Sequence, residues 1–275
     1  MKTGKMRRRI LVVLGTRPEA IKLAPVVQEL GRRRGTFHCA LCVTSQHREM
    51  LAPMLRFFGL EPKYDLDVMR PAQALGELTG RVLAGLDRVL EAENPDWVVV
   101  QGDTTTAMAA ALAAFYRKIR VAHVEAGLRT NDKYSPFPEE INRRLVGSLA
   151  DLHFAPTDQA VRNLRREGIP AERIVQTGNT VTDALLWANR KNRARPPHLP
   201  TGLPPPAKGR KLVLVTGHRR ENFGGGLEQI CQALKAAAEA RPELDFVYPV
   251  HLNPSVQQPV RRLLGGQPRI FLVPP

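Results

Sequence analysis

The chain has 275 residues, of which 43% are hydrophobic and 24% are charged. This composition excludes a short peptide and a disordered chain, and it supplies enough apolar surface for about two domains with cores of their own. The charge is unusual, because 41 Lys and Arg against 26 Asp and Glu give a formal net charge of +15. An excess of this size indicates partners that carry phosphate.

The N-terminal segment lacks the features of a secretion signal. Its apolar run, Ile10–Leu14, is shorter than the ~7–15 residues of a signal-peptide core. No run in the sequence reaches the ~18 apolar residues of a membrane span, so we expect a cytoplasmic protein. Cys39 and Cys42 stand three residues apart on a predicted strand and therefore face opposite sides of it. We expect small buried residues there rather than a redox pair or a shared metal site.

Apolar runs typical of buried strands alternate with helical patterns through the first two thirds of the chain. This alternation predicts a doubly wound α/β domain with a parallel sheet. The predicted strands span Ile10–Leu14, Phe37–Val43, Trp97–Val100, Arg120–Val124, Leu152–Phe154 and Arg173–Gln176. The predicted helices span Ala20–Arg33, Arg48–Phe58, Ala74–Ala92, Thr105–Tyr116, Glu139–Leu149, Asp158–Glu167 and Val181–Asn189.

A proline-rich stretch interrupts this pattern at residues 193–209 and predicts a linker between a domain at 1–192 and a domain at 210–275. The pattern then resumes, with strands predicted at Lys211–Val215, Asp245–Val250 and Ile270–Val273 and helices at Leu227–Ala240 and Ser255–Leu264. A doubly wound half usually has five or six strands. We therefore predict two Rossmann-like domains, the second of them incomplete.

Ligands of open parallel sheets bind beyond the carboxyl ends of the strands, and in this sequence those positions are polar or charged. They are Arg17 and Lys22 after the first strand, Gln46 and His47 after the second, then Asp103, Glu125 and Glu139, and in the second domain His218, Arg219 and Arg220. We expect these groups to converge on one crevice between the domains.

Taken singly, each of these residues also has a structural interpretation. Arg17 could pair with Glu19, and Asp103 could cap the helix that follows it. Glu125 and Glu139 could be salt-bridge partners in so basic a chain, and Glu139 also suits a helix N-terminus. The functional interpretation rests on the joint occurrence of these residue types at successive strand ends.

Standard cofactor motifs are missing. The first strand is followed by GTRPEA rather than GxGxxG, and no GxxxxGK[ST] run occurs, so neither NAD nor ATP is indicated. The run Phe223-Gly224-Gly225-Gly226 precedes a predicted helix, and with His218, Arg219 and Arg220 it predicts an anion cradle that suits a diphosphate. His218 could instead be a polar residue at a turn. Metal-ligand spacings and nucleophile settings are also missing, which leaves acid–base chemistry.

Eight longer motifs follow one another along the chain. They are GTRPEAIK (15–22), TSQHREML (44–51), GDTTT (102–106), HVEAGLRT (123–130), YSPFPEEINR (134–143), TGNTVTDAL (177–185), TGHRREN (216–222) and YPVHLNP (248–254). Together they resemble the non-hydrolysing UDP-N-acetylglucosamine 2-epimerases, from Ile10 to the last residue. The resemblance implies a glycosyltransferase-B-like fold with the nucleotide sugar between two Rossmann-like domains.

The resemblance further implies that UDP-GlcNAc and UDP-ManNAc are interconverted through loss of UDP, a 2-acetamidoglucal and re-addition of UDP. It also implies that the reaction requires no metal and no organic cofactor. The implied catalytic residues are Asp103, Glu125, Glu139, His218 and Arg17. The implied substrate-binding residues are Arg17, Lys22, Asp103, Glu125, His218 and Arg219. Which carboxylate removes the C2 proton and which returns it is open at this stage.

The resemblance also implies an allosteric activator and a homodimer. A second UDP-GlcNAc would bind as an allosteric activator at Gln46, Glu139, Arg219 and His251. We expect a homodimer that supplies ManNAc for surface polysaccharide. Family chains continue past position 275 with residues that bind uridine and ribose, so the resemblance implies a C-terminally truncated chain and impaired turnover by residues 1–275.

Two other functions compete with this prediction. A hydrolysing relative would release free ManNAc and UDP from the same glycal-forming step. A binding protein for nucleic acid or another polyanion would also explain the charge. Only 5% of the residues are aromatic and the basic clusters are separated along the chain, so the sequence favours an enzyme with neither nucleic acid nor membrane as a partner.

Overall fold

The structure, a computed structural model, describes residues 7–45, 48–70, 73–196, 203, 209–217 and 225–274. The chain divides into two compact units, Met1–Lys191 and Asn192–Pro275. The elements within each unit follow the alternation of strands and helices that the sequence predicts.

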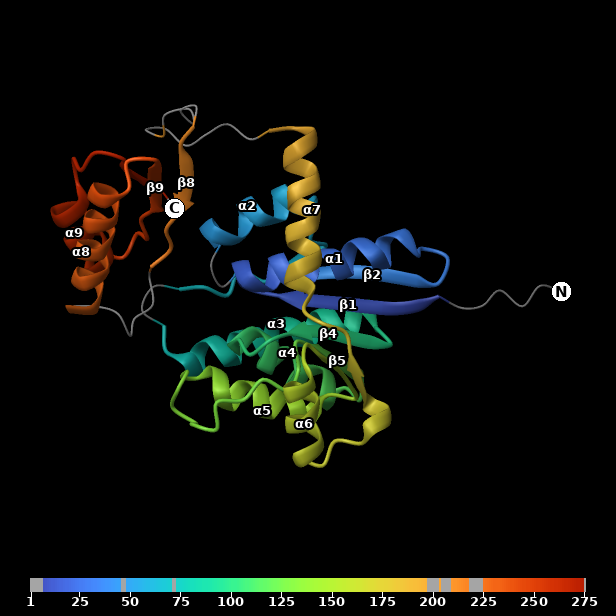
Figure 1. The fold of residues 1–275 in the computed structure, drawn as a ribbon. Coiled ribbons are helices and arrows are strands. Elements are labelled where there is room, and N and C mark those ends of the chain that lie inside the picture. The colour runs from blue at the N-terminus through green and yellow to red at the C-terminus, as the bar shows by residue number, and fades with distance from the viewer. Residues whose placement is uncertain are drawn as a thin grey trace. The chain divides into compact units, whose positions relative to one another are not determined.

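The first unit is built on a seven-stranded parallel sheet in the order β3-β2-β1-β4-β5-β6-β7 (Figure 1). Its strands are β1 (Arg8–Leu14), β2 (Phe37–Val43), β3 (Tyr64–Asp65), β4 (Trp97–Gln101), β5 (Arg120–Val124), β6 (Leu152–Ala155) and β7 (Ile174–Gln176). The direction of winding reverses between β1 and β4, and doubly wound sheets bind their ligands at such a switch point.

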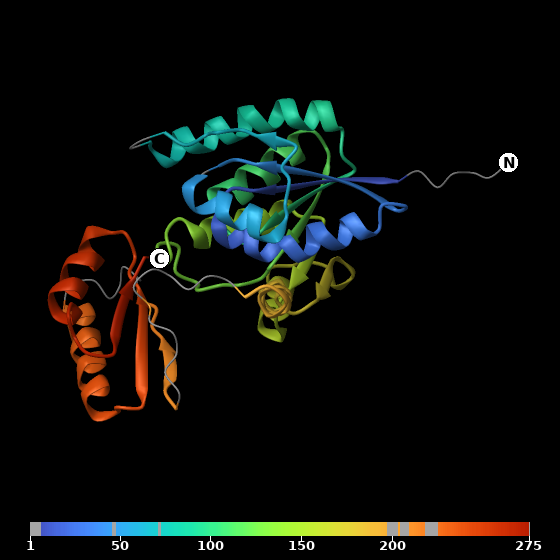
Figure 2. The same cartoon turned by 90° about the horizontal axis from the view of Figure 1, so that it is seen from above.

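Within the described residues, six α-helices and one 3₁₀ turn lie between these strands, and a seventh helix follows the last strand. They are α1 (Arg17–Arg32), α2 (Arg48–Phe58), α3 (Leu75–Glu93), α4 (Thr105–Tyr116), α5 (Glu139–Leu149), α6 (Asp158–Arg166), the 3₁₀ turn Ala171–Arg173 and α7 (Thr180–Ala194). Helices α1, α2 and α7 lie on one face of the sheet and α3, α4 and α5 on the other (Figures 1 and 2). Both faces are therefore covered, which explains why the strands read as continuous apolar runs.

Alternate strand residues enter two separate apolar cores. Leu11 packs with α3 and α4, whereas its neighbour Val12 packs in the core under α1. Cys42 and Cys39 are divided between the same two cores, and both are free thiols. The opposite orientation predicted for the two cysteines is confirmed.

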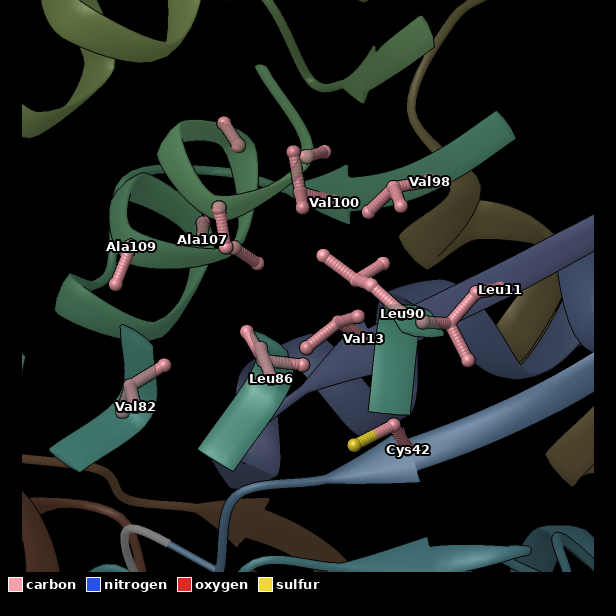
Figure 3. Packing of buried hydrophobic residues seen from close by; sticks show 14 of the residues in the cluster. Leu11, Val13, Cys42, Val82, Leu86, Leu90, Val98, Val100, Ala107 and Ala109 are labelled. Carbon is pink, nitrogen blue, oxygen red and sulfur yellow. The ribbon is translucent and has the colours of Figure 1, made fainter. Parts of the chain in front are cut away.

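The core between the sheet and α3 and α4 consists of small and branched aliphatic residues. Six alanines of α4 are buried, so this helix approaches the strands closely. The apolar side chains of two strands and two helices meet there (Figure 3). They include Leu11 and Val13 of β1, Val98 and Val100 of β4, Val82, Leu86 and Leu90 of α3, and Ala107 and Ala109 of α4.

Helix α7 is joined to the first unit by an aromatic cluster. The ring of Trp187 lies 5.6 Å from that of Phe57 and 5.0 Å from that of Phe58 in α2, and such ring pairs stabilise beyond their buried area. Trp187 and Trp97 of β4 are the two tryptophans of the sequence. Tryptophan fluorescence therefore reports on the first unit alone.

The second unit contains a three-stranded parallel sheet in the order β10-β9-β8. Its elements are β8 (Lys211–Leu214), α8 (Gly225–Ala240), β9 (Leu244–Pro249), α9 (Pro254–Leu264) and β10 (Ile270–Val273), with both helices on one face of the sheet (Figures 1 and 2). Tyr248 is fully buried and donates from its hydroxyl to the Gly217 carbonyl at 2.7 Å, which fixes the backbone after β8. This unit is a partial Rossmann-like sheet, as the sequence predicts.

Candidate active site

The carboxyl ends of β1, β4 and β5 meet at the switch point of the first unit and carry polar side chains. The Arg17 side chain follows β1, Asp103 follows β4 and Glu125 follows β5. Because β4 is hydrogen-bonded to both β1 and β5, the sheet brings these three segments together. The structure thus places the strand ends that carry Arg17, Asp103 and Glu125 side by side in the first unit, and the convergence of the other predicted residues stays a prediction.

Glu125 is the best-connected of the three carboxylates. Lys22 Nζ donates to Glu125 Oε1 at 2.8 Å and to Oε2 at 2.6 Å. Asn179 Nδ2 donates to Oε1 at 2.7 Å, and Gln101 Nε2 donates to Oε2. The side chain is only 10% exposed, so these donors replace the water that an exposed carboxylate would have. Glu125 therefore combines the strand-end position that we predicted with an ion pair to Lys22.

The Glu125 backbone is also unusual. Its φ is +63°, in the left-handed region that residues other than Gly, Asn and Asp rarely adopt. Such a conformation usually costs about 1–3 kcal/mol and persists because surrounding contacts hold it. The three side-chain donors supply such contacts here.

Asp103 lies in a different electrostatic setting. Burial raises the pKa of its carboxyl, and the negative charges of Glu125 and Glu139 raise it further, against the opposing effect of Arg143. Arg143 of α5 donates to Asp103 Oδ2, and Asn142 Nδ2 donates to the Asp103 carbonyl at 3.0 Å. Asp103 is thus a partly buried carboxyl whose protonated form is favoured by the charges of Glu125 and Glu139.

The alternative role of Asp103 as a helix cap is wrong. Helix α4 is capped by the next residue, Thr104, whose Oγ1 accepts a hydrogen bond from Ala107 N at 3.0 Å. The Asp103 carboxylate thus has no capping partner and points to Arg143 instead.

Glu139 and Glu140 begin α5 but have different environments. Glu140 is fully buried, and it accepts hydrogen bonds from the backbone N–H groups of Thr130 and Asn131 and from Arg144. Glu139 is partly buried and has no hydrogen bond or ion pair with another described residue. Glu140 therefore holds the preceding loop, and Glu139 is the one that acts on Asp103.

Arg17 is exposed at the first turn of α1 and does not pair with Glu19. Glu19 is 1% exposed and accepts hydrogen bonds from Gly15 N at 2.9 Å, from Thr16 N and Oγ1 at 2.7 Å and from Thr104 Oγ1 at 2.6 Å. Burial raises the pKa of this carboxyl, although each of the hydrogen bonds lowers it. Glu19 thus joins the turn that carries Arg17 to the turn that carries Asp103.

His123 of β5 contacts the turn that carries Asp103. It is 1% exposed, and its Nε2 lies 2.8 Å from the carbonyl oxygen of Gly102, to which it donates. Its Nδ1 has no hydrogen-bond partner among the described residues. Burial lowers the pKa of His123 to about 3, so the ring is neutral at pH 7.

We expect the first unit to lose stability as the pH falls from about 6.5 toward 3. The unfolded chain binds a proton at His123 near the ordinary pKa of 6.5, whereas the folded chain resists it down to about 3, so acid favours unfolding by roughly 1 kcal/mol per pH unit. Denaturant unfolding followed by tryptophan fluorescence measures this slope. A His123→Gln variant, which can donate to the same carbonyl and does not titrate, should show a shallower slope; equal slopes would contradict the assignment.

Three predicted residues, Gln46, His218 and Arg219, lie outside the described residues, as do His47 and Arg220. His251 is described and belongs to the second unit, where its Nδ1 accepts a hydrogen bond from Asn253 N at 3.1 Å. The proposed diphosphate and activator residues of the second unit thus remain predictions.

Four residues with contacts to the site were not predicted, namely Gln101, Asn142, Arg143 and Asn179. Arg143 stands four residues after Glu139, so the helical period of α5 gave a usable signal that the two share a face. Gln101 and Asn179 reach Glu125 from other elements, and no local pattern marks them.

An apolar cavity of about 440 Å³ lies elsewhere in the first unit. Its lining includes Ile10, Val26, Trp97 and Phe154 and contains none of the carboxylates described above. The cavity is therefore not a candidate for acid–base chemistry.

Two kinds of feature are missing from the described part of the chain. No described helix is long and apolar enough to cross a membrane. Among the described residues, no group of three or more His, Cys, Asp or Glu side chains is arranged to hold a metal ion.

Comparison with known proteins gives concordant matches. A family model described as UDP-N-acetylglucosamine 2-epimerase matches residues 28–275. A UDP-N-acetylglucosamine 2-epimerase of Yersinia pestis is 54% identical over 271 residues, which make up 97% of this chain and 72% of the relative.

Two solved structures match over nearly the whole chain. The UDP-GlcNAc 2-epimerase of Neisseria meningitidis, bound to UDP-GlcNAc, has 44% identity and a TM-score of 0.84, and the match covers 97% of this chain and 72% of that one. The enzyme of Methanocaldococcus jannaschii, in complex with UDP-GlcNAc and UDP, has 32% identity and a TM-score of 0.75, with 97% and 73% covered.

The seven-stranded doubly wound sheet and the second parallel sheet define a glycosyltransferase-B-like α/β protein whose second Rossmann-like unit is partial. The carboxylates at the switch point fit a member of this class that performs acid–base chemistry. The chain belongs to the UDP-N-acetylglucosamine 2-epimerase family. It spans 72% of the length of the Yersinia relative.

Proposed function

We propose that the protein inverts the configuration at C2 of the sugar in UDP-GlcNAc and so interconverts UDP-GlcNAc and UDP-ManNAc. The observation that carries the proposal is the pair Asp103 and Glu125. Burial and neighbouring carboxylates raise the pKa of Asp103, whereas Glu125 accepts hydrogen bonds from three donors, including the Lys22 ammonium. One carboxyl is thus in a setting that favours its protonated form, and the other is held in place by donors to both of its oxygens.

Inversion at C2 needs an indirect route, because that C–H bond is not acidic. In the proposed reaction the C1–O bond to UDP breaks, the C2–H bond breaks, and the released electron pair forms the C1=C2 bond of a 2-acetamidoglucal. A proton then adds to the opposite face of C2 while a UDP oxygen bonds again to C1. As UDP leaves, C1 becomes oxocarbenium-like, which makes the C2 proton removable by a carboxylate.

Two faces of the sugar require two proton-handling groups. Ionised Glu125 accepts the proton from one face, and protonated Asp103 donates to the other; in the reverse direction the roles exchange. Carboxyl groups whose environments separate their protonation states are the usual means of running acid and base chemistry at one pH. Glu139 contributes by favouring the protonated form of Asp103.

Departure of UDP requires positive charge near the diphosphate. The exposed Arg17 guanidinium, at the first turn of α1, can supply it from the first unit. We further propose His218 and Arg219 as diphosphate ligands from the second unit, on the strength of the TGHRREN motif. Lys22 orients Glu125 and lies within reach of a sugar bound at the same edge of the sheet.

We also propose a homodimer and a second UDP-GlcNAc as activator, at Gln46, Glu139, Arg219 and His251. The motifs that contain these residues support this assignment. Light scattering of the purified protein tests the dimer. A sigmoidal dependence of the rate on UDP-GlcNAc concentration tests the activator, and a hyperbolic dependence would count against it.

Incubation with UDP-GlcNAc in D₂O tests the main proposal. We expect deuterium at C2 of UDP-ManNAc, because the Asp103 carboxyl that returns the proton has already exchanged with D₂O. We expect it also in recovered UDP-GlcNAc, because Glu125 exchanges the proton it took up before the reverse reaction. Mass spectrometry detects this exchange even when turnover is slow. UDP that accumulates without UDP-ManNAc would favour the hydrolysing reaction, and the absence of both exchange and products would refute the proposal.

A further inference from the structure

Asn179 connects the start of α7 to Glu125. Its Oδ1 accepts a hydrogen bond from Val181 N at 3.0 Å, and its backbone carbonyl accepts one from Thr182 N at 3.1 Å. These are the contacts of a helix-capping residue. Its other side-chain atom, Nδ2, donates to Glu125 Oε1 at 2.7 Å. One amide side chain therefore caps a helix with its oxygen and binds a carboxylate with its nitrogen.

The three donors to Glu125 come from three different elements and differ in charge. Lys22 of α1 contributes a positive charge, whereas Gln101 of β4 and Asn179 contribute neutral amides. A neutral donor fixes the direction of a carboxylate oxygen without cancelling its charge. The start of α7 also presents the positive end of a helix dipole to the same oxygen.

The capping geometry leaves the Asn179 amide little freedom. With Oδ1 bound to Val181 N, rotation of the amide by half a turn would break the cap and place oxygen against oxygen at Glu125. The helix start thus determines which atom faces the carboxylate. Trp187, on the same helix, packs against Phe57 and Phe58 and holds α7 in place.

We propose that Asn179 is a positioning residue, which uses the N-terminus of α7 to fix the orientation of the Glu125 carboxylate for proton transfer. The inference rests on the proposed function of Glu125. It assigns to Asn179 a role in the rate of the reaction in addition to its role in the helix.

The substitution Asn179→Asp separates the two roles. Asp caps helices as well as Asn does, so a purely structural role predicts no change in activity or melting temperature. If Asn179 positions Glu125, the variant loses a donor and places a second carboxylate against the first. We then expect kcat to fall about 10–100-fold with KM changed less than about twofold, since misplaced reacting groups cost about this much.

A melting experiment tests the contact without relying on turnover. Repulsion between the introduced carboxylate and that of Glu125 should lower the melting temperature of the first unit by about 2–4 °C, measured by tryptophan fluorescence. In the Glu125→Gln background the same substitution should have no such effect, because the repelling charge is gone. The substitution Asn179→Ser, which keeps a capping oxygen but no amide donor, should also reduce kcat, and it does so without introducing a repelling charge.

The matched control is Thr157→Asp. Thr157 caps α6 through a hydrogen bond from Ala160 N at 3.2 Å, and the substitution adds the same charge at an exposed helix cap. We expect wild-type kcat from this variant. An Asn179→Asp variant with wild-type kcat, or with equal melting shifts in the two backgrounds, would overturn the proposal. A wild-type protein that shows no exchange at C2 would refute the proposed function instead. The melting temperatures of Asn179→Asp in the wild-type and Glu125→Gln backgrounds would still show whether Asn179 contacts Glu125.

Discussion

The substitution Asp103→Asn is expected to reduce kcat by a factor of about 10²–10⁴, the usual contribution of a general acid–base group. An amide keeps the size of the carboxyl and can still bond Arg143, but it cannot take up or release the proton that C2 requires. Deuterium incorporation at C2 and UDP-ManNAc formation should fall together. The raised pKa of Asp103 also means that its charge is poorly solvated in the folded protein, so the variant should fold with little loss of stability.

The control for this substitution is Asp158→Asn. Asp158 is exposed in the first turn of α6 and forms no hydrogen bond or ion pair with another described residue. Its replacement makes the same change of side chain away from the site and should leave kcat at the wild-type value. If the Asp103→Asn variant retained more than about a tenth of wild-type activity, Asp103 would not be one of the two proton-handling groups.

The substitution Glu19→Ala is expected to destabilise the first unit by about 3–5 kcal/mol. It would leave Gly15 N, Thr16 N and the Thr104 hydroxyl without their buried acceptor, and each unsatisfied group costs about 1–3 kcal/mol. This loss is a large fraction of the 5–15 kcal/mol that usually stabilises a domain. Denaturant unfolding monitored through Trp97 and Trp187 measures it.

A comparison with Glu19→Gln isolates the charge. Gln keeps the volume and an acceptor for both backbone N–H groups, so its cost should be about 1 kcal/mol. Because burial raises the pKa of Glu19 in the folded protein, the stabilising contribution of this carboxyl is complete below its ordinary pKa of 4.5 and is lost as the pH rises through the folded-state value. The difference in the free energy of unfolding between wild type and the Glu19→Gln variant should therefore become smaller as the pH rises. A difference that grows with pH would show that the carboxylate is better solvated than its burial indicates.

The strands of both units could be predicted closely because each is a continuous apolar run, and Phe37–Val43 and Arg120–Val124 match the structure at both ends. β3 was missed, since two residues are too few to show a period. α1 begins at Arg17 rather than at Ala20, because Thr16 and Glu19 form a capping box that precedes the apolar pattern.

The site was predictable only where a residue directly follows a strand. Asp103 and Glu125 met that condition, and the sheet order then brought them together. Lys22 was predicted as a substrate-binding residue, but its hydrogen bonds to Glu125 were not predicted, and Gln101 and Asn179 were missed altogether. These three donors reach Glu125 across 103, 24 and 54 positions of sequence. Such pairings depend on how helices settle on the sheet, which local patterns do not encode.

The division of labour between Thr104 and Asp103 has a consequence for the evolution of the fold. Thr104 caps the N-terminus of α4, and the contact of Asp103 with Asn142 uses only the backbone carbonyl, which every residue has. Position 103 can therefore change its reactive group without cost to the helix beside it. Mutation can explore new chemistry at this strand end while the scaffold stays intact, and a protein engineer could install a Cys or His there for the same reason.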